Sequence, residues 1–275
     1  MGHLTLRGVR IAVANRTLLE PFDLDVLPGE LVAIVGPNGV GKTTLLRAMA
    51  GFDAPASGEI ALDGTSLQTL VPHRRAQLVA ALSADPEAPN GMTVREVALS
   101  GRFAQRRWWD WTRGPDDDEA VDAALARVDL SDKADRAFDT LSSGERQRAW
   151  IALALAQGAR ALLLDEPTSH LDAHYAIDVL GLLRGIAREG TTVVSVLHDL
   201  NEAAAFADRI AILGDGRLLA YAAPAIALDP STLERAYGIG FARVYVDGEP
   251  RVFARSTNGR AVARPFEKVR DSGRI

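Results

Sequence analysis

The fold of this chain is set by one stretch, Gly36-Pro37-Asn38-Gly39-Val40-Gly41-Lys42-Thr43-Thr44. The stretch matches the pattern Gly-x-x-x-x-Gly-Lys-Ser/Thr without a gap. An apolar run, Leu31-Val32-Ala33-Ile34-Val35, comes before it and is typical of a strand buried on both faces of a sheet. Apolar residues then recur at helical spacing from Leu45 to Ala50, and Gly51 ends that pattern. The sequence therefore predicts a strand, a glycine loop and a helix in succession, which is the context that the pattern requires.

The residue types in this stretch are those of a phosphate-binding loop. Gly36, Gly39 and Gly41 allow the backbone to turn its N–H groups inward, where they can bind phosphate oxygens. The helix that begins near Lys42 adds the positive end of its dipole. We expect Lys42 to reach the β- and γ-phosphates of a nucleotide and the Thr43 hydroxyl to bind Mg²⁺. An ordinary glycine turn is the alternative, and the flanking strand and helix argue against it.

The composition is that of a soluble globular protein and restricts the function. Of 275 residues, 47% are hydrophobic and 24% are charged. The longest apolar runs are too short to span a bilayer, and the first seven residues do not have the layout of a signal peptide. There is no cysteine, which excludes disulfides and thiolate metal sites. The net charge of −5 gives no general reason to expect nucleic-acid binding.

Strand patterns surround the loop on both sides. Residues 4–13 and 22–27 are predicted to form a hairpin, with Asn15-Arg16-Thr17 as its turn. Further short strands are expected at residues 59–62 and 78–82. The pattern of a parallel sheet returns after residue 160, and this later part is predicted to contain the strands 161–164 and 192–197.

Between about residue 84 and residue 156 the pattern is helical. Thr93 and Glu96 have the spacing of a capping box at a helix start, and another helix is predicted to begin at Pro115. This section is interpreted as an inserted helical subdomain within a domain that covers residues 1–255. Residues 256–275 are predicted to be a polar tail. The predicted class is therefore α/β, with a mixed P-loop sheet, an N-terminal antiparallel β subdomain and the helical insertion.

Three tryptophans, Trp108, Trp109 and Trp111, lie in an arginine-rich part of the helical section. One interpretation is that they contact a membrane partner, because aromatic residues and arginine are favoured in interface hot spots. The other is local packing of an irregular loop. The sequence leaves both open.

Two carboxylates follow the apolar strand that ends at Leu164. In P-loop enzymes an acid at such a strand end holds Mg²⁺, and Asp165 has that position. Glu166 is the candidate general base that polarises an attacking water molecule. His198 follows another apolar strand and is a candidate contact to a γ-phosphate. A solvated acidic turn and a structural histidine are the alternatives.

A second candidate anion site precedes a helical pattern at residues 150–155. There, Ser142, Ser143 and Gly144 can place hydroxyl and backbone donors at a helix N-terminus, with Glu145 following them. A simple capped helix is the alternative.

These motifs together carry a resemblance to a known family. The segments GPNGVGKTT, LSSGERQ and LLLDEPTSHLD and the strand before His198 resemble, in order and spacing, the ATP-binding cassette (ABC) ATPases. The resemblance covers residues 4 to 255. Within that family, residues 145–152 and 232–239 resemble the ATPase subunits of importers for iron-siderophores, haem and vitamin B12.

The resemblance implies roles that spacing does not show. Two cassettes of this family enclose two ATP molecules, so Ser142, Ser143, Gly144 and Glu145 of one chain would complete the phosphate-loop site of a second chain. Asp172 resembles a residue that lines the seam between the two, and His198 resembles the switch histidine of the family. ATP and Mg²⁺ are the implied cofactors.

Two positions depart from the family pattern. The family has an aromatic residue that stacks on adenine, and Val13 occupies that position here, which suggests loose nucleobase selectivity. The family also has a glutamine after the strand that ends near Leu82, and Ala84 occupies that position. Asp85, the next residue, is a candidate to supply an oxygen to Mg²⁺ in its place.

The function implied is that of the ATP-hydrolysing subunit of an importer for a metal chelate, of siderophore, haem or cobalamin type. The implied partners are transmembrane permease subunits, a second ATPase subunit in a homodimer and, indirectly, a solute-binding protein, with no nucleic acid. The place implied is the cytoplasmic face of the cell membrane. The ATPase of an exporter or a lipoprotein-release system, and a nucleotide-switched regulator, remain as alternatives.

Overall fold

The computed structural model describes residues 2–14, 16–84, 86–87, 91–106 and 114–255. Predictions for Asp85, for the three tryptophans and for the tail at 256–275 lie outside these residues.

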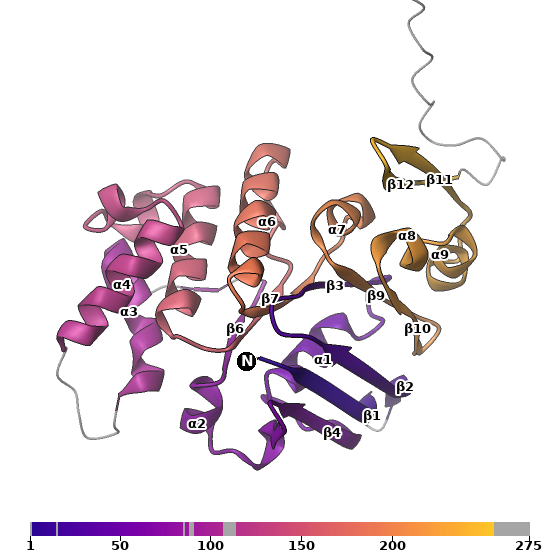
Figure 1. Ribbon diagram of the computed structural model, residues 1–275, viewed down its shortest axis with the longest axis horizontal. Coiled ribbons are helices and arrows are strands. Elements are labelled where there is room, and N and C mark those ends of the chain that lie inside the picture. Colours follow the sequence, from indigo (N-terminus) through magenta and orange to yellow (C-terminus); the bar gives the residue numbers. More distant parts are fainter. Residues whose placement is uncertain (1, 15, 85, 88–90, 107–113, 256–275) are drawn as a thin grey trace, which may run out of the picture.

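Figure 1 shows the arrangement of the strands and helices. The strands are β1 Leu4–Val13, β2 Arg16–Val26, β3 Leu31–Val35, β4 Ser57–Leu62, β5 Thr65–Ser66, β6 Val79–Leu82, β7 Ala161–Asp165, β8 Thr192–Val196, β9 Arg209–Gly214, β10 Arg217–Ala222, β11 Phe241–Val246 and β12 Glu249–Ala254. The helices are α1 Lys42–Met49, α2 Pro72–Ala76, α3 Val94–Ser100, α4 Pro115–Arg127, α5 Ser143–Ala156, α6 Ala173–Arg188, α7 Leu200–Phe206, α8 Pro224–Ala227 and α9 Pro230–Tyr237.

The central sheet has the strand order β10-β9-β3-β8-β7-β6. Its neighbours from β9 to β6 pair in parallel, while β10 pairs antiparallel with β9 at one edge. Every residue of β3, β7 and β8 is buried, as the continuous apolar runs predict. Because β3, β8 and β7 are parallel neighbours, their carboxyl ends meet at one edge of the sheet. That edge carries the phosphate loop, the two carboxylates and His198.

Two hydrophobic cores fill the two faces of this sheet. Side chains alternate along β3, so Leu31 and Val35 belong to one core, while Val32 and Ile34 belong to the other. The first core contains apolar residues of α5, α6 and α7. The second contains residues of α1 and of the N-terminal sheet. In Figure 1, α6 and α7 accordingly lie above the central sheet, and α1 lies below it with β1 and β2.

The N-terminal sheet is antiparallel in the order β2-β1-β4-β5, as predicted. The predicted start of its second strand at residue 22 is wrong, because β2 begins at Arg16. Val13 pairs with Arg16 and Ala12 pairs with Thr17, so two of the residues expected in the turn, Arg16 and Thr17, already belong to the ladder. Register shifts interrupt the pairing between Leu6 and Ala12. Such irregularities break the alternation of apolar residues that a strand prediction relies on.

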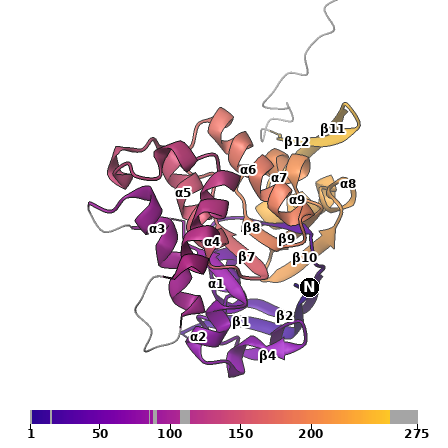
Figure 2. The same cartoon turned by 60° about the vertical axis from the view of Figure 1, so that its left-hand side comes forward.

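Three α-helices, α3, α4 and α5, lie between strands β6 and β7, where the sequence predicts a helical section (Figure 2). The predicted capping box is present, because Thr93 accepts from the Glu96 N–H and the Glu96 carboxylate accepts from the Thr93 N–H. The buried Asp117 in the first turn of α4 pairs with Arg102 at 2.9 Å and with Arg106 at 2.9 Å. These ion pairs fix α4 to the segment that follows α3.

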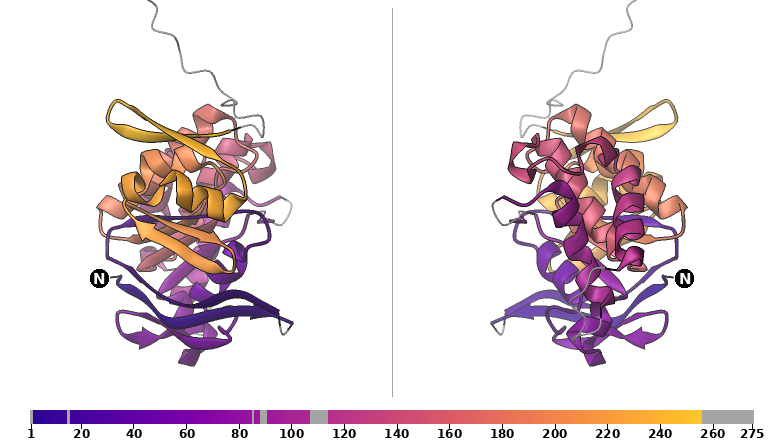
Figure 3. Two further views of the ribbon diagram at one scale, coloured as in Figure 1. Left: turned by 90° about the vertical axis from the view of Figure 1, so that its right-hand side faces the viewer. Right: turned by 90° about the vertical axis from the view of Figure 1, so that its left-hand side faces the viewer.

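After the central sheet, the chain forms α8, α9 and the hairpin of β11 and β12. Figure 3 shows this hairpin and the N-terminal sheet at opposite ends of the molecule. Among the described residues, no helix is both long and apolar enough to cross a membrane.

Candidate nucleotide site

The glycine loop connects the buried end of β3 to the first turn of α1. Its three glycines have positive φ angles, +154° at Gly36, +78° at Gly39 and +107° at Gly41, which favour glycine. At Gly36 a β-carbon would also lie 2.4 Å from the carbonyl oxygen of Leu213. Gly41 is the N-cap of α1 and has no side chain to cap the helix, so the first N–H groups of α1 remain available to an anion.

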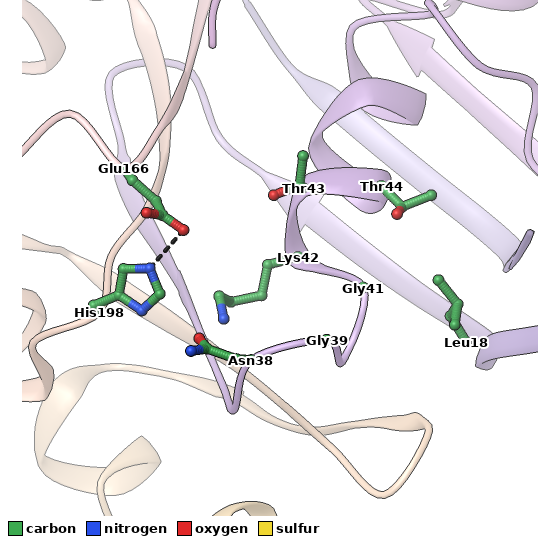
Figure 4. Close-up of a pocket in the computed structure, with 9 residues that line it drawn as sticks. All are labelled: Leu18, Asn38, Gly39, Gly41, Lys42, Thr43, Thr44, Glu166 and His198. Carbon is green, nitrogen blue, oxygen red and sulfur yellow. Dashed lines mark ion pairs between the residues drawn. The ribbon is translucent and has the colours of Figure 1, made fainter. Parts of the chain in front are cut away.

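A cavity of about 420 Å³ opens beside this loop. It is lined by Leu18, Asn38, Gly39, Gly41, Lys42, Thr43, Thr44, Glu166 and His198 (Figure 4). The structure thus brings the loop together with the two predicted catalytic residues, Glu166 and His198, each of which lies more than a hundred positions after the loop in the sequence.

Lys42 is the buried cation of the site. Its side chain turns back along the loop, and Nζ donates to the carbonyl oxygens of Gly36 at 2.8 Å and Pro37 at 3.1 Å. Burial lowers the pKa of Lys42, while the charges of Glu166 and Asp165 act in the opposite direction. A phosphate anion would compensate the buried charge better than the two carbonyl oxygens do.

Asp165 ends strand β7 and is buried with 7% of its surface exposed. Burial raises the pKa of its carboxyl, and a hydrogen bond from the Thr43 side chain acts against that shift. Its Oδ1 atom has no hydrogen-bond partner. An unpaired buried carboxylate oxygen next to a hydroxyl suits Mg²⁺, which proteins usually hold with one or two side chains plus phosphate oxygens and water. Among the described residues no group of three or more acidic, histidine or cysteine side chains could hold a metal alone.

Glu166 and His198 contact each other in the lining of the cavity. Nε2 of His198 lies 2.5 Å from Oε1 of Glu166, from the ends of the neighbouring strands β8 and β7 (Figure 4). Glu166 has a φ of +52°, which is uncommon for a residue other than glycine. Its backbone N–H donates to the carbonyl of Val196 at 3.1 Å. The Glu166 carboxylate contacts His198, and its negative charge contributes to the raised pKa of Asp165.

The second candidate anion site does not line this cavity. The Ser142 hydroxyl accepts from the Glu145 N–H and the Glu145 carboxylate accepts from the Ser142 N–H, so the pair forms a capping box on α5. A Lys133 ion pair at 2.9 Å and this capping lower the pKa of Glu145 to about 2. Ser142 and Ser143 are exposed and Gly144 is buried.

Gly144 and Asp172 connect this motif to the start of α6. A β-carbon at Gly144 would lie 2.7 Å from the ring of Tyr175, so the absence of a side chain lets α5 approach α6 closely. Asp172 caps α6 by accepting from the N–H groups of His174 and Tyr175, each at 3.1 Å. Asp172 is likewise absent from the residues that line the phosphate-loop cavity.

Val13 and Ala84, the two positions that depart from the family pattern, have different surroundings in the structure. Val13 is half exposed and borders a separate hollow of about 240 Å³ that includes Thr44. The side chain that lines the main cavity from the N-terminal sheet is Leu18, which sequence reasoning missed. Leu18 is recognised only from the structure, in which a β-carbon at Gly41 would lie 3.3 Å from the Leu18 side chain. Ala84 is exposed.

Comparison with known proteins identifies the family. The sequence profile of the ABC transporter family matches residues 19–169, which is more than half of the chain. The chain belongs to the ABC transporter family. It is 38% identical to the ferric enterobactin transport ATP-binding protein FepC of Escherichia coli (strain K12) over 85% of this chain and 87% of FepC. It is 42% identical to the hemin import ATP-binding protein HmuV of Rhodopseudomonas palustris (strain BisB18), over 90% of this chain and 93% of that protein.

The fold of this ABC protein is also found in solved structures. A metal-chelate type ABC transporter in an inward-facing conformation has a TM-score of 0.82 with it, at 23% identity, over 94% of this chain and 99% of that chain. The predicted fold class and family are confirmed. As a member of this family, the chain is an ATPase.

Proposed function

We propose that this ABC ATPase powers the uptake of a metal chelate, of siderophore, haem or cobalamin type, through a separate transmembrane permease. The observation that carries the proposal is the site itself, in which Lys42, Glu166 and His198 line one cavity and the buried Asp165 lies next to Thr43 of the same loop. Relatives that match most of the chain are named for ferric enterobactin transport and for hemin import, which supports the direction and the class of solute.

The chemistry assigned to the chain is the attack of water on the γ-phosphate of ATP. Lys42 moves from the carbonyls of Gly36 and Pro37 to the phosphates, and the N–H groups at the start of α1 bind phosphate oxygens. The Thr43 hydroxyl and Asp165 would hold Mg²⁺, which neutralises charge on the phosphates.

Glu166 is the proposed general base. It accepts a proton from the attacking water, and its strained backbone keeps the carboxylate outside the Asp165 metal site. His198 lies within 2.5 Å of this carboxylate and fixes its orientation. His198 also lines the cavity, and in this proposal it would contact the γ-phosphate when nucleotide is bound.

Two copies of the chain form the working unit in this proposal. The exposed Ser142 and Ser143 do not line the cavity of their own chain, so their anion-binding hydroxyls remain available to a second chain. The buried Gly144 lies against Tyr175, whose N–H donates to the cap residue Asp172, so this packing connects the motif to the proposed seam residue. A homodimer would sandwich two ATP molecules at this surface. The unit would associate with the permease at the cytoplasmic face of the membrane.

Reconstitution with a permease tests the proposal. A candidate permease would be co-purified with the chain and placed in lipid vesicles. ATP hydrolysis and uptake of ferric siderophore, haemin or cobalamin would then be measured. We expect hydrolysis that rises with the permease and uptake of one chelate that Glu166→Gln abolishes. Hydrolysis without uptake of any chelate, or movement of solute outward, would contradict the import assignment.

A further inference from the structure

The C-terminal segment, defined here as α9 and the hairpin of β11 and β12, contacts the nucleotide site at two separate places. It lies outside the residues 19–169 that match the family profile. The first place is the beginning of the glycine loop, and the second is the helix that follows His198. Both contacts join a side chain to a backbone group far away in the sequence.

The first contact is at Gly36, the first residue of the glycine loop. The hydroxyl of Tyr237, the last residue of α9, lies beside the backbone N–H of Gly36, which acts against the rise that burial causes in the pKa of Tyr237. The Gly36 carbonyl accepts from Lys42 Nζ at 2.8 Å. The Tyr237 ring is largely enclosed and packs against Phe241, with 5.6 Å between the ring centroids. Lys42 and Tyr237 therefore lie next to the two backbone polar groups of the first loop residue.

Close packing of α9 supports this contact. A β-carbon at Gly214, the last residue of β9, would lie 2.6 Å from the backbone of Ala236. The preceding residue, Leu213, presents its carbonyl 2.4 Å from where a β-carbon of Gly36 would be. Helix α9 therefore packs closely on the end of β9, and the end of β9 packs closely on the start of the loop. Each of these close approaches requires a glycine.

The second contact holds the helix after His198. Asn201 lies in the first turn of α7, three residues beyond His198. Its side chain bonds to both backbone groups of Val252 in β12, because Nδ2 donates to the carbonyl at 3.2 Å and Oδ1 accepts from the N–H at 2.9 Å. An amide is the side-chain group that can satisfy a backbone donor and a backbone acceptor together.

From these two contacts we propose that Tyr237 and Asn201 are positioning residues for ATP hydrolysis, one acting through the phosphate loop and the other through His198. The proposal rests on the function proposed above, because it assigns roles relative to Lys42 and His198. When Lys42 leaves the Gly36 carbonyl for the phosphates, Tyr237 keeps the start of the loop in place. Asn201 keeps α7, and with it His198, at its distance from Glu166.

The two residues predict different kinetic defects. Tyr237→Phe keeps the ring and its packing and removes the hydroxyl, so we expect ADP binding with magnesium to weaken about five-fold, as for one lost hydrogen bond, with kcat within about two-fold. Asn201→Ala releases α7 from β12, so we expect kcat to fall about five-fold or more with ADP affinity unchanged. Binding would be measured by calorimetry, hydrolysis by phosphate release and folding by thermal melting.

Matched variants separate these effects from a general loss of structure. Tyr245→Phe removes an exposed hydroxyl from β11, and Glu249→Gln changes an exposed residue at the start of β12. Both should match the wild type in affinity and in kcat. Asn201→Asp keeps an acceptor for the Val252 N–H and loses the donor, so its kcat should lie between those of the wild type and Asn201→Ala.

The outcomes are distinguishable from failure of the proposed function. If the wild type hydrolyses ATP and Tyr237→Phe binds ADP as Tyr245→Phe does, Tyr237 does not position the loop and the inference is overturned. It is also overturned if Asn201→Ala changes only the melting temperature, or if both variants lose affinity and kcat together. A wild type without hydrolysis would overturn the proposed function instead.

Discussion

Nε2 of His198 lies 2.5 Å from Oε1 of Glu166, and the two side chains come from the carboxyl ends of neighbouring parallel strands. The backbone at Glu166 takes a φ of +52°, and the carboxylate one residue earlier, on Asp165, is buried beside Thr43. Two adjacent carboxylates thus have separate environments, and separate environments permit separate roles in catalysis.

Removing the His198 side chain tests the importance of this pair. His198→Ala should lower kcat for ATP hydrolysis by tenfold or more, because the Glu166 carboxylate loses the group that orients it. ADP affinity should change little, since Lys42 and the loop remain intact. The control is His174→Ala, which removes an exposed imidazole from α6. Equal kcat values in the two variants would contradict a catalytic role for His198.

Replacing the buried carboxylate of Asp165 should stabilise the fold but impair ATP hydrolysis. Burial raises the pKa of its carboxyl, so the ionised form destabilises the folded protein at neutral pH. Asp165→Asn should therefore raise the free energy of unfolding by about 1 kcal/mol, measured by urea denaturation without nucleotide. The same variant should lose the stimulation of hydrolysis by Mg²⁺. A less stable variant that still responds to Mg²⁺ would contradict this account of the site.

Mixing two inactive variants tests the composite site. Lys42→Ala removes the phosphate contact from one chain, and Ser143→Arg blocks the exposed motif of another. If each site combines the loop of one chain with the motif of its partner, a mixed dimer contains one intact site. We expect ATP hydrolysis to reappear on mixing, approaching about a quarter of the wild-type rate at equal concentrations. The fraction follows because random pairing makes half of the dimers mixed, and each mixed dimer has one intact site out of two. It assumes that the two sites act independently.

The controls for this experiment are the two variants alone, each of which should be inactive. If mixing restores no hydrolysis although the two variants associate, the sites are not shared between chains. If Ser143→Arg hydrolyses ATP alone, the motif has no part in the reaction.

Glu145 gives a pH dependence of stability. Its folded pKa of about 2 lies below the ordinary value of 4.5, mainly because of the hydrogen bond from Lys133. A depressed carboxyl pKa stabilises the fold above the ordinary pKa, and this stabilisation is lost as the pH falls from about 4.5 toward 2.

Glu145→Gln should therefore lower the free energy of unfolding by about 1 kcal/mol at pH 7, and the difference from wild type should narrow below pH 4.5. Urea denaturation at a series of pH values measures this difference. The control is Glu249→Gln, an exposed change in β12 that should show no such narrowing. A difference that stays constant down to pH 3 would contradict the role of the ionised Glu145.

Much of the nucleotide site follows from the sequence because its residues lie in short motifs with fixed geometry. The run from Leu31 to Val35 and the glycines after it define one strand and loop, and Asp165 and Glu166 end a second buried strand. Their convergence could be expected, since parallel strands in one sheet end at the same edge. The start of α3 could also be predicted from a local motif, because Thr93 and Glu96 have the spacing of a capping box.

Contacts between distant segments could not be predicted in this way. Leu18 reaches the cavity only because β2 packs beside the loop, and Tyr237 meets Gly36 across two hundred residues of sequence. The early start of β2 at Arg16 was hidden by register shifts in its pairing with β1. Tertiary packing decides each of these three features, and none of them has a local pattern.

The most direct test of the central claim is steady-state hydrolysis of ATP by the purified chain with Mg²⁺, compared with Glu166→Gln, with ATP binding measured on the same samples. The account predicts hydrolysis by the wild type and a kcat at least 100-fold lower for Glu166→Gln, which still binds ATP because Lys42 and the loop are unchanged. Hydrolysis at the wild-type rate by Glu166→Gln would contradict the assignment of Glu166 as the general base and, with it, the proposed mechanism.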